Sequence, residues 1–226
     1  MDVDAAKRAA GEEAATLVED GMTLGLGTGS TAHWFIVAVG RLVQEGRRLR
    51  GVATSQAAAA LAEQLGIPLV DLDAHDLDLA VDGADVVDPD LRLIKGAGGA
   101  LVREKIVAAA ADRFVVVVDE TKLRRPLAGT VPVEVVPFGV RSTLRALSAT
   151  GPRFAVRRRI DGSPLLSDNG NLLADGAYEV IDDPEGLAAR LDAIPGVVGH
   201  GLFLGMADLV LVARLDGTVD RLTPAR

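Results

Sequence analysis

Cysteine is absent from this chain of 226 residues, which excludes disulfide bonds, thiolate metal sites and a cysteine nucleophile. Aromatic residues make up only 3% of the sequence, too few for the stacking surfaces that bind single-stranded nucleic acid. The formal net charge of −8 also argues against DNA or RNA, because a phosphate backbone needs a cationic face. We therefore expect no nucleic-acid partner.

Long apolar stretches are missing as well, since no run reaches the roughly 18 residues that a membrane-spanning helix requires. Residues 1–15 are charged and helix-forming, without the apolar segment of a signal peptide. The lack of cysteine fits a reducing compartment. These features predict a cytoplasmic protein with no membrane association, and its length is enough to bury a sizeable core.

Lysine is scarce, because only four of the 24 basic residues are lysines: Lys7, Lys95, Lys105 and Lys122. A chain that otherwise uses arginine can keep lysine where a compact ammonium is needed rather than a planar fork. The longest uninterrupted basic run is Arg157-Arg158-Arg159, and we interpret it as a solvated strand edge or the rim of an interface.

In the first half of the chain, short apolar runs alternate with helical patterns. We expect helices over residues 3–19, from the end of GTGSTA to about 43, 56–65 and 98–111, and strands over 22–26, 51–54, 68–71, 77–82, 91–95 and 114–118. Such alternation predicts an α/β fold with a mainly parallel, Rossmann-like sheet that carries helices on both faces.

From about residue 131 the order becomes strand, helix, strand, strand, helix, strand. The expected strands are 132–138, 153–156 and 195–203, the helices are 139–150 and 184–194, and a hairpin turns at 168–170 within 165–174. This order predicts a smaller, inserted ferredoxin-like α+β domain over 131–202. Residues 1–130 and 203–226 then form the catalytic α/β domain, to which the apolar run 207–213 returns as a strand.

The glycine-rich stretch 25–32, GLGTGSTA, follows a predicted strand and precedes a predicted helix. Glycines let the backbone approach a ligand closely, and the helix N-terminus offers N–H groups to an anion, so a phosphate site is one interpretation. A capped tight turn is the other. The stretch also fits a dinucleotide pattern, but the next strand ends in Ala53-Thr54-Ser55 without the carboxylate that pattern requires.

The sequence VDGAD, residues 81–85, ends another apolar strand with two carboxylates three positions apart. Ligands of open α/β sheets bind beyond the carboxyl ends of the strands, where Asp82 and Asp85 could bind hydroxyls and move protons. Asp and Gly also punctuate ordinary turns. The aspartates between 71 and 90 lack the EF-hand spacing, and the three histidines are scattered, so we expect no metal site.

A second glycine-rich turn, KGAGG at 95–99, leads into a further predicted helix. Its lysine precedes the glycines and no Lys-Ser/Thr pair closes it, so it is not a Walker A loop. Lys122 follows the apolar strand 114–118 and therefore also lies at a carboxyl-end loop. We expect these loops to converge on one crevice.

Glu104 falls on the apolar face of the helix predicted over residues 98–111. Ala100 and Leu101 precede it by four and three residues, and Val107 and Ala108 follow it by three and four. A carboxylate on a buried face is costly unless it is paired or used, and desolvation raises its pKa towards a value suited to a base near neutrality. The pattern alone leaves a structural salt bridge and a catalytic base as equal interpretations.

The chain resembles the type A family of ribose-5-phosphate isomerases. The matching stretches cover nearly the whole chain in family order: GTGSTA (27–32), VDGAD (81–85), IKGAGGALVREKI (94–106), DETK (119–122), PVEVVPF (132–138), LSDNGN (166–171) and IPGVVGHGLF (194–203). Ala97 and Thr121 stand where Gly and Ser are common in the family, and because both residues are small they leave the resemblance in place.

The resemblance implies a substrate site for a pentose 5-phosphate, no cofactor and no metal, in a homodimer or homotetramer. Glu104 takes the family's proton-acceptor position, and Asp82 and Lys95 are the further catalytic residues. The implied substrate-binding residues are Lys7, Thr28, Gly29, Ser30, Thr31, Asp82, Gly83, Ala84, Asp85, Lys95, Gly96, Ala97, Gly98 and Lys122.

The implied reaction interconverts D-ribose 5-phosphate and D-ribulose 5-phosphate through an enediolate, within the non-oxidative pentose phosphate pathway. A sugar-phosphate-sensing domain of a transcription regulator is one alternative, but no basic helix-turn-helix precedes residue 20. A nucleotide- or methyl-donor-dependent enzyme is another, and it leaves Glu104 and Lys122 without a role. A related deaminase or lactonase is the third alternative, and only the full set of motifs argues against it.

Overall fold

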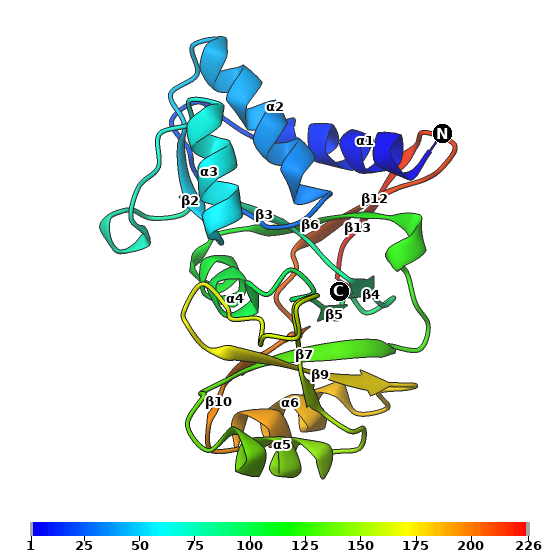
Figure 1. The fold of residues 1–226 in the computed structure, drawn as a ribbon. Helices are drawn as coiled ribbons and strands as arrows, with labels where there is room; N and C mark the ends of the chain where they lie inside the picture. Colours follow the sequence, from blue (N-terminus) through cyan, green and yellow to red (C-terminus); the bar gives the residue numbers. More distant parts are fainter. Residues whose placement is uncertain (1, 225–226) are drawn as a thin grey trace. The chain divides into compact units, whose positions relative to one another are not determined.

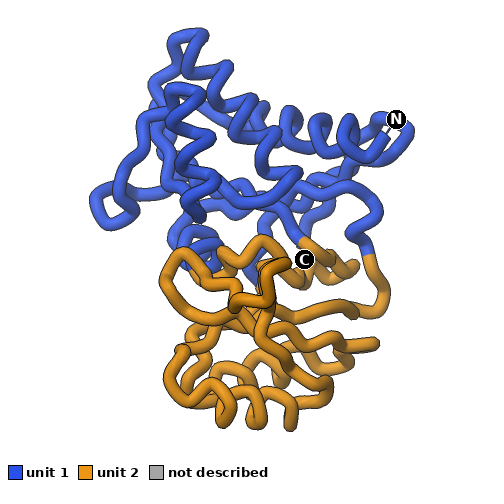
Figure 2. Tube along the Cα trace, in the orientation of Figure 1, with its two compact units in different colours: residues 1–84, 103–123, 205–226 blue, residues 85–102, 124–204 orange. Residues whose placement is uncertain are grey.

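The structure is a computed structural model that describes residues 2–224. The chain divides into two compact units, coloured separately in Figure 2: unit 1 comprises residues 1–84, 103–123 and 205–226, and unit 2 comprises 85–102 and 124–204. Packing thus groups 85–102 and 124–130 with the segment 131–202. The sequence analysis places those two segments in the catalytic domain. That the catalytic function belongs to residues 1–130 and 203–226 stays a prediction.

Unit 1 is built on a six-stranded sheet with the order β13-β12-β6-β3-β1-β2. All neighbours pair in parallel except β12 and β13, which confirms the expected mainly parallel sheet. The central strands are buried on both faces, so they are continuous apolar runs. The strands are β1 Thr23–Leu26, β2 Arg50–Ala53, β3 Leu79–Gly83, β6 Phe114–Asp119, β12 Leu209–Ala213 and β13 Val219–Leu222.

Helices cover both faces of this sheet (Figure 1). On one face, α1 Val3–Ala15, α2 Ala32–Gln44 and α3 Gln56–Gln64 share a core with alternate side chains of the strands, such as Leu26, Val81 and Val117. On the other face, α4 Leu101–Ala110 places Val107 against Gly25. Within the described residues, no helix combines the length and apolarity needed to cross a membrane.

Unit 2 contains a four-stranded antiparallel sheet with the order β10-β7-β9-β8. Helices α5 Val140–Ser148 and α6 Pro184–Asp192 pack on one face, where Val131, Val133 and Val135 point. The strand-helix-strand-strand-helix-strand order confirms the expected ferredoxin-like topology. The strands are β7 Gly129–Val135, β8 Ala155–Val156, β9 Leu172–Tyr178 and β10 Val197–His200, and a small second sheet has the order β11 Leu202–Phe203, β5 Leu93–Ile94, β4 Val86–Val87.

Some predicted elements of unit 1 are shorter in the structure or absent from it. Helix α1 ends at Ala15 rather than at residue 19, and the hydroxyl of its C-cap residue Thr16 donates to the carbonyl of Glu13 in the last turn. Residues 68–71 form no named strand: Pro68 has no N–H to donate, and only an isolated bridge joins Leu69 to Gly51. The sequence pattern does not indicate the short strands β4 and β13.

The predicted strand 195–203 is divided between the two sheets of unit 2. β10 pairs with β7 and β11 pairs with β5, and Gly201 lies between them. Its N–H donates to the carbonyl of Pro132 at 2.7 Å, and its carbonyl accepts from the N–H of Lys95 at 2.8 Å. A Cβ on Gly201 would lie 2.1 Å from the carbonyl oxygen of Lys95, so only glycine permits this crossing.

We predict that Gly201→Ala lowers the free energy of unfolding by about 1–3 kcal/mol, because backbone atoms must move apart to admit the methyl group. Gly83→Ala is the matched control, since a Cβ there would find its nearest neighbours at 3.8 Å. Chemical denaturation of both variants measures the difference. Equal stability of the Gly201→Ala variant and the parent protein would contradict the role given to this glycine.

Candidate active site

The strand order of unit 1 reverses direction at β1. Strand β2 pairs with one edge of β1 and β3 pairs with the other. In doubly wound sheets, ligands bind beyond the carboxyl ends of the strands at such a point. The loop 27–31 follows β1 and residues Asp82 and Gly83 end β3, so the structure brings these two predicted segments to the same edge.

Asp82 ties the two strand ends together. Its Oδ1 atom accepts hydrogen bonds from the N–H groups of Thr28 at 2.9 Å and Gly83 at 2.7 Å. A Cβ on Gly27 would lie 2.4 Å from the Asp82 side chain. The buried aspartate occupies the space that a side chain at position 27 would need, which is why this residue is glycine. Its place in a glycine-rich loop suggested instead that the glycine makes room for a ligand.

The Thr28 side chain locks the same loop to β2. Its Oγ1 atom lies 2.7 Å from Oγ1 of Thr54 and donates to Oγ of Ser55 at 2.8 Å. Thr54 and Ser55 occupy the place where a dinucleotide-binding protein carries a carboxylate. Their hydroxyls support the loop instead, a role that the sequence indicated only through polar residues at the end of a strand.

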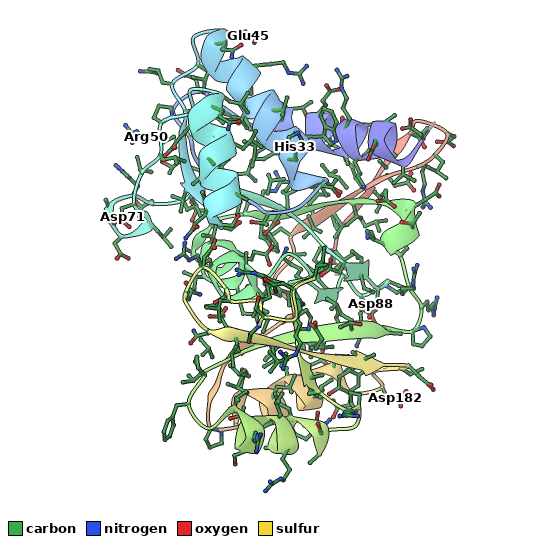
Figure 3. The ribbon with its side chains drawn as sticks, viewed as in Figure 1. His33, Glu45, Arg50, Asp71, Asp88 and Asp182 are labelled. Atoms are coloured by element: carbon green, nitrogen blue, oxygen red, sulfur yellow. The ribbon has the colours of Figure 1, made fainter. Side chains whose placement is uncertain are left out.

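The first turn of α2 presents backbone donors. Thr31 is its N-cap residue and makes no side-chain capping bond, and within residues 2–224 the N–H groups of Ser30 and Thr31 donate to no protein group. A helix N-terminus of this kind attracts anions. His33, labelled in Figure 3, follows in the same turn. A small cavity of about 100 Å³ adjoins the loop, lined by Gly27, Thr28, Gly29, His33, Ile36, Ala57, Ala58 and Leu61.

Glu104 lies on the buried face of α4, as its spacing predicted. The side chain is only 4% exposed, and Leu101, Val107 and Ala108 on the same face are buried too. Arg103 and Lys105 on the flanks are less buried. A carboxylate in these surroundings is held at a cost in free energy, because burial removes its hydration.

The direction of α4 places Glu104 towards the carboxyl edge of the sheet. Just beyond the helix, the N–H of Asp112 donates to the carbonyl of Leu77 at 2.8 Å, close to the start of β3. Residues earlier in α4 must therefore lie towards the carboxyl ends of the strands. Glu104 is one turn, about 4.5 Å, before Val107, which packs at Gly25 in β1. It thus lies in the direction of Asp82.

Lys122 ends a short 3-10 helix, η2 Glu120–Lys122, that follows β6. The buried Asp119 caps it by accepting from the backbone and hydroxyl of Thr121. Glu120 is paired with Arg214 at 3.2 Å, and hydrogen bonds to Asp220 and then Glu120 raise the pKa of that guanidinium. These contacts hold Lys122 at the strand end.

Lys7 comes from a different element, α1. Its side chain is 17% exposed, and its Nζ atom lies 3.6 Å from Asp4 one turn earlier. This lysine belongs to unit 1. Among the described residues, its ammonium group forms an ion pair with Asp4 and no bond to the loop 28–31.

Unit 2 holds the remaining predicted residues, Asp85 and Lys95–Gly98, in one group. Oδ2 of Asp85 accepts from the N–H of Ala97 at 2.9 Å. The side chain of Lys95 is buried, with Nζ 5.4 Å from the ring centroid of Phe203. The peptide bonds after Ala84 and Val102 connect these residues to Asp82 and Glu104 of unit 1.

An anion-binding turn and buried carboxylates at the carboxyl edge of an α/β sheet are typical of enzymes that act on phosphorylated small molecules. Residues 50–217 match the family model of ribose 5-phosphate isomerase A, also called phosphoriboisomerase A. The chain belongs to the ribose 5-phosphate isomerase A family, whose members are isomerases.

Known relatives match along the whole chain. The ribose-5-phosphate isomerase A of Roseiflexus sp. (strain RS-1) is 51% identical over 230 residues, covering 100% of this chain and 99% of that protein. A D-ribose-5-phosphate isomerase solved in complex with phospho-erythronic acid is 41% identical, with a TM-score of 0.95 over 99% of this chain and 100% of that one. The Methanocaldococcus jannaschii enzyme is 44% identical, with a TM-score of 0.92 over 96% and 98%.

We predict that Thr28→Val lowers the free energy of unfolding by about 1–2 kcal/mol, because its methyl group cannot replace the hydroxyl bonds to Thr54 and Ser55. Thr28→Ser keeps the hydroxyl and is the control. Denaturant titration compares the three proteins. If the valine variant is as stable as the serine variant, the hydroxyl does not support the loop.

Proposed function

We propose that this chain is a ribose-5-phosphate isomerase that interconverts D-ribose 5-phosphate and D-ribulose 5-phosphate without a metal or organic cofactor. Family membership along the whole chain supports the reaction. The observation that carries the mechanism is Glu104, a carboxylate buried on an apolar helix face, one turn from Val107 on the side of the strand ends that carry Asp82. A protein retains such a group when it is paired or when its chemistry is used.

The phosphate of the substrate is assigned to unit 1. The N–H groups of Ser30 and Thr31 and the positive end of the α2 dipole supply an uncharged anion site. Lys7 and Lys122 add two ammonium groups. Binding the phosphate, which does not react, orients the reacting carbons and so converts remote binding energy into rate.

Asp82 and Lys95 are assigned to the hydroxyl groups of the sugar. Asp82, with Lys95, assists the opening of the sugar ring by moving a proton between the hydroxyl at C1 and the ring oxygen. Asp82 is suited to this task because its Oδ1 atom is fixed by two backbone N–H groups. Gly83, Ala84 and Asp85 continue the same binding segment.

Glu104 then removes the proton from C2 of the open aldose. The electron pair of that bond forms the C1–C2 double bond, and the carbonyl oxygen at C1 becomes anionic. Glu104 returns its proton to C1, while the proton of the C2 hydroxyl passes to the oxygen at C1 and leaves a ketone at C2. Lys95 and the exposed backbone N–H of Gly98 in the glycine-rich turn stabilise the oxyanion of the enediolate.

We predict that Glu104→Gln lowers kcat by about 10²- to 10⁴-fold, because an amide cannot accept the C2 proton. Binding of ribose 5-phosphate persists, since the residues that hold the phosphate are unchanged. Formation of ribulose 5-phosphate in EDTA measures turnover, and calorimetry measures binding. Glu63→Gln, the same change at an exposed position of α3, is the control.

Two outcomes would overturn the proposal. Near-normal turnover by the Glu104→Gln variant removes the assigned base. Failure of the folded parent protein to convert ribose 5-phosphate removes the reaction itself, and tests of amino-sugar phosphates and sugar-phosphate lactones then distinguish the related deaminase and lactonase activities.

We predict separately that Lys7→Met raises KM for ribose 5-phosphate about tenfold and changes kcat less than threefold, because it removes an interaction made equally in the ground and transition states. Arg8→Met is the control, since the adjacent arginine pairs with Glu12 instead. Steady-state kinetics compares the variants. A fall in kcat with KM unchanged would show that Lys7 acts in the chemical step.

The proposal includes a cytoplasmic enzyme of the non-oxidative pentose phosphate pathway that forms a homodimer or homotetramer. The absence of cysteine fits a reducing compartment. Exposed apolar side chains on unit 2, of which Phe138 and Ile160 are the most exposed, supply candidate contacts between subunits. Light scattering measures the subunit number directly.

A further inference from the structure

The glycine-rich turn of unit 2 lies on the sheet face that α5 and α6 leave uncovered. Val131, Val133 and Val135 point towards those helices, so Pro132 between them points the other way. A Cβ on Gly96 would lie 3.4 Å from Cβ of Pro132. The turn therefore rests directly on β7 and its neighbours.

Arg157 reaches this turn from the residue after β8. Its Nε and Nη2 atoms donate to the two carboxylate oxygens of Asp175 in β9, at 2.7 and 2.6 Å. The side chain is only 17% exposed. A bidentate pair of this kind fixes both the position and the plane of the guanidinium. The interpretation of the arginine run as a solvated edge is therefore wrong for this member.

The remaining nitrogen of Arg157 holds two successive carbonyls of the turn. Nη1 donates to the carbonyl of Ala97 at 2.7 Å and to that of Gly96 at 3.3 Å. Asp85 holds the turn from the opposite side by accepting from the N–H of Ala97. The Gly96–Ala97 peptide is thus fixed at both its oxygen and its hydrogen.

The following peptide, Ala97–Gly98, is held only at its carbonyl oxygen. In a planar trans peptide, the C=O and N–H bonds point in opposite directions. Because Arg157 holds the carbonyl of Ala97, the N–H of Gly98 must point away from Arg157, to the side on which Asp85 lies. Gly98 is exposed, and within residues 2–224 its N–H donates to no protein group. Such an oriented N–H is a donor for an anionic oxygen.

We propose that Arg157, held by Asp175, is a positioning residue that aims the Gly98 N–H at the oxyanion of the substrate. This inference rests on the proposed isomerase function. Arg157 does not touch the substrate in this scheme. It acts through the backbone by preventing rotation of the Ala97–Gly98 peptide.

The kinetic test uses Arg157→Met, Arg157→Lys and Asp175→Asn in the full chain. We expect Arg157→Met to lower kcat about 10- to 100-fold with KM changed less than threefold, because the phosphate is held elsewhere. Lysine cannot make the bidentate pair and the carbonyl bonds together, so it restores only part of the activity. Arg158→Met is the control, since the Arg158 side chain bonds to the carbonyl of Gly162, away from the turn.

A binding test separates positioning from general loss of structure. Two probes are titrated by calorimetry: inorganic phosphate and phospho-erythronic acid, which carries both a phosphate and a carboxylate. We expect the affinity of the Arg157→Met variant for phospho-erythronic acid to fall about tenfold and its affinity for inorganic phosphate to stay the same. At saturating phospho-erythronic acid, the ¹⁵N–¹H signal of Gly98 should shift by more in the parent protein and the Arg158→Met variant than in the Arg157→Met variant.

Two results would overturn the proposal: unchanged kcat in Arg157→Met, or equal loss of affinity for both probes. If Arg157→Met does not fold, the same criteria apply to Arg157→Lys and Asp175→Asn. If the parent protein lacks isomerase activity, the proposed function fails. The two probes and the Gly98 signal then still decide whether Arg157 orients an anion-binding amide.

Discussion

One carboxylate oxygen, Oδ1 of Asp82, connects the parts of unit 1 on which the site depends. It accepts from backbone groups on both β1's loop and the end of β3, so the two strand ends at the reversal of the sheet order cannot move independently. The bond requires a glycine at position 27. The loop that this bond holds continues into Ser30 and Thr31, where α2 begins and where we propose that the phosphate binds.

Much of this fold follows from local patterns in the sequence. The run at 114–118 is buried on both faces because it is central in a parallel sheet, and continuous apolar sequence predicts that position. The buried face of α4 follows from residues three and four apart, which is why the burial of Glu104 could be predicted. The crossing at Gly201 could not, because an unbroken apolar stretch does not reveal that its halves join different sheets.

The candidate site shows the same division between local and long-range information. The loops after β1 and β3 are recognisable from glycines and aspartates beside apolar runs. The hydroxyl contacts of Thr28 with Thr54 and Ser55 join residues 26 and 27 positions apart, and no periodic pattern encodes them. Arg157 is the clearest case. Three consecutive arginines suggest a solvated edge, whereas the partners that bury the first one lie 18 and 60 positions away in the sequence.

The chain passes from one unit to the other four times, after residues 84, 102, 123 and 204. Three of these passages adjoin residues assigned to the site: Ala84 and Asp85, Val102 two positions before Glu104, and Leu123 after Lys122. Unit 2 is therefore not a cassette that recombination could exchange at a single pair of junctions. Any replacement would cut the chain beside residues that we assign to the site. Exchange of unit 2 would therefore disturb the proposed site itself, whereas substitutions within the continuous chain need not.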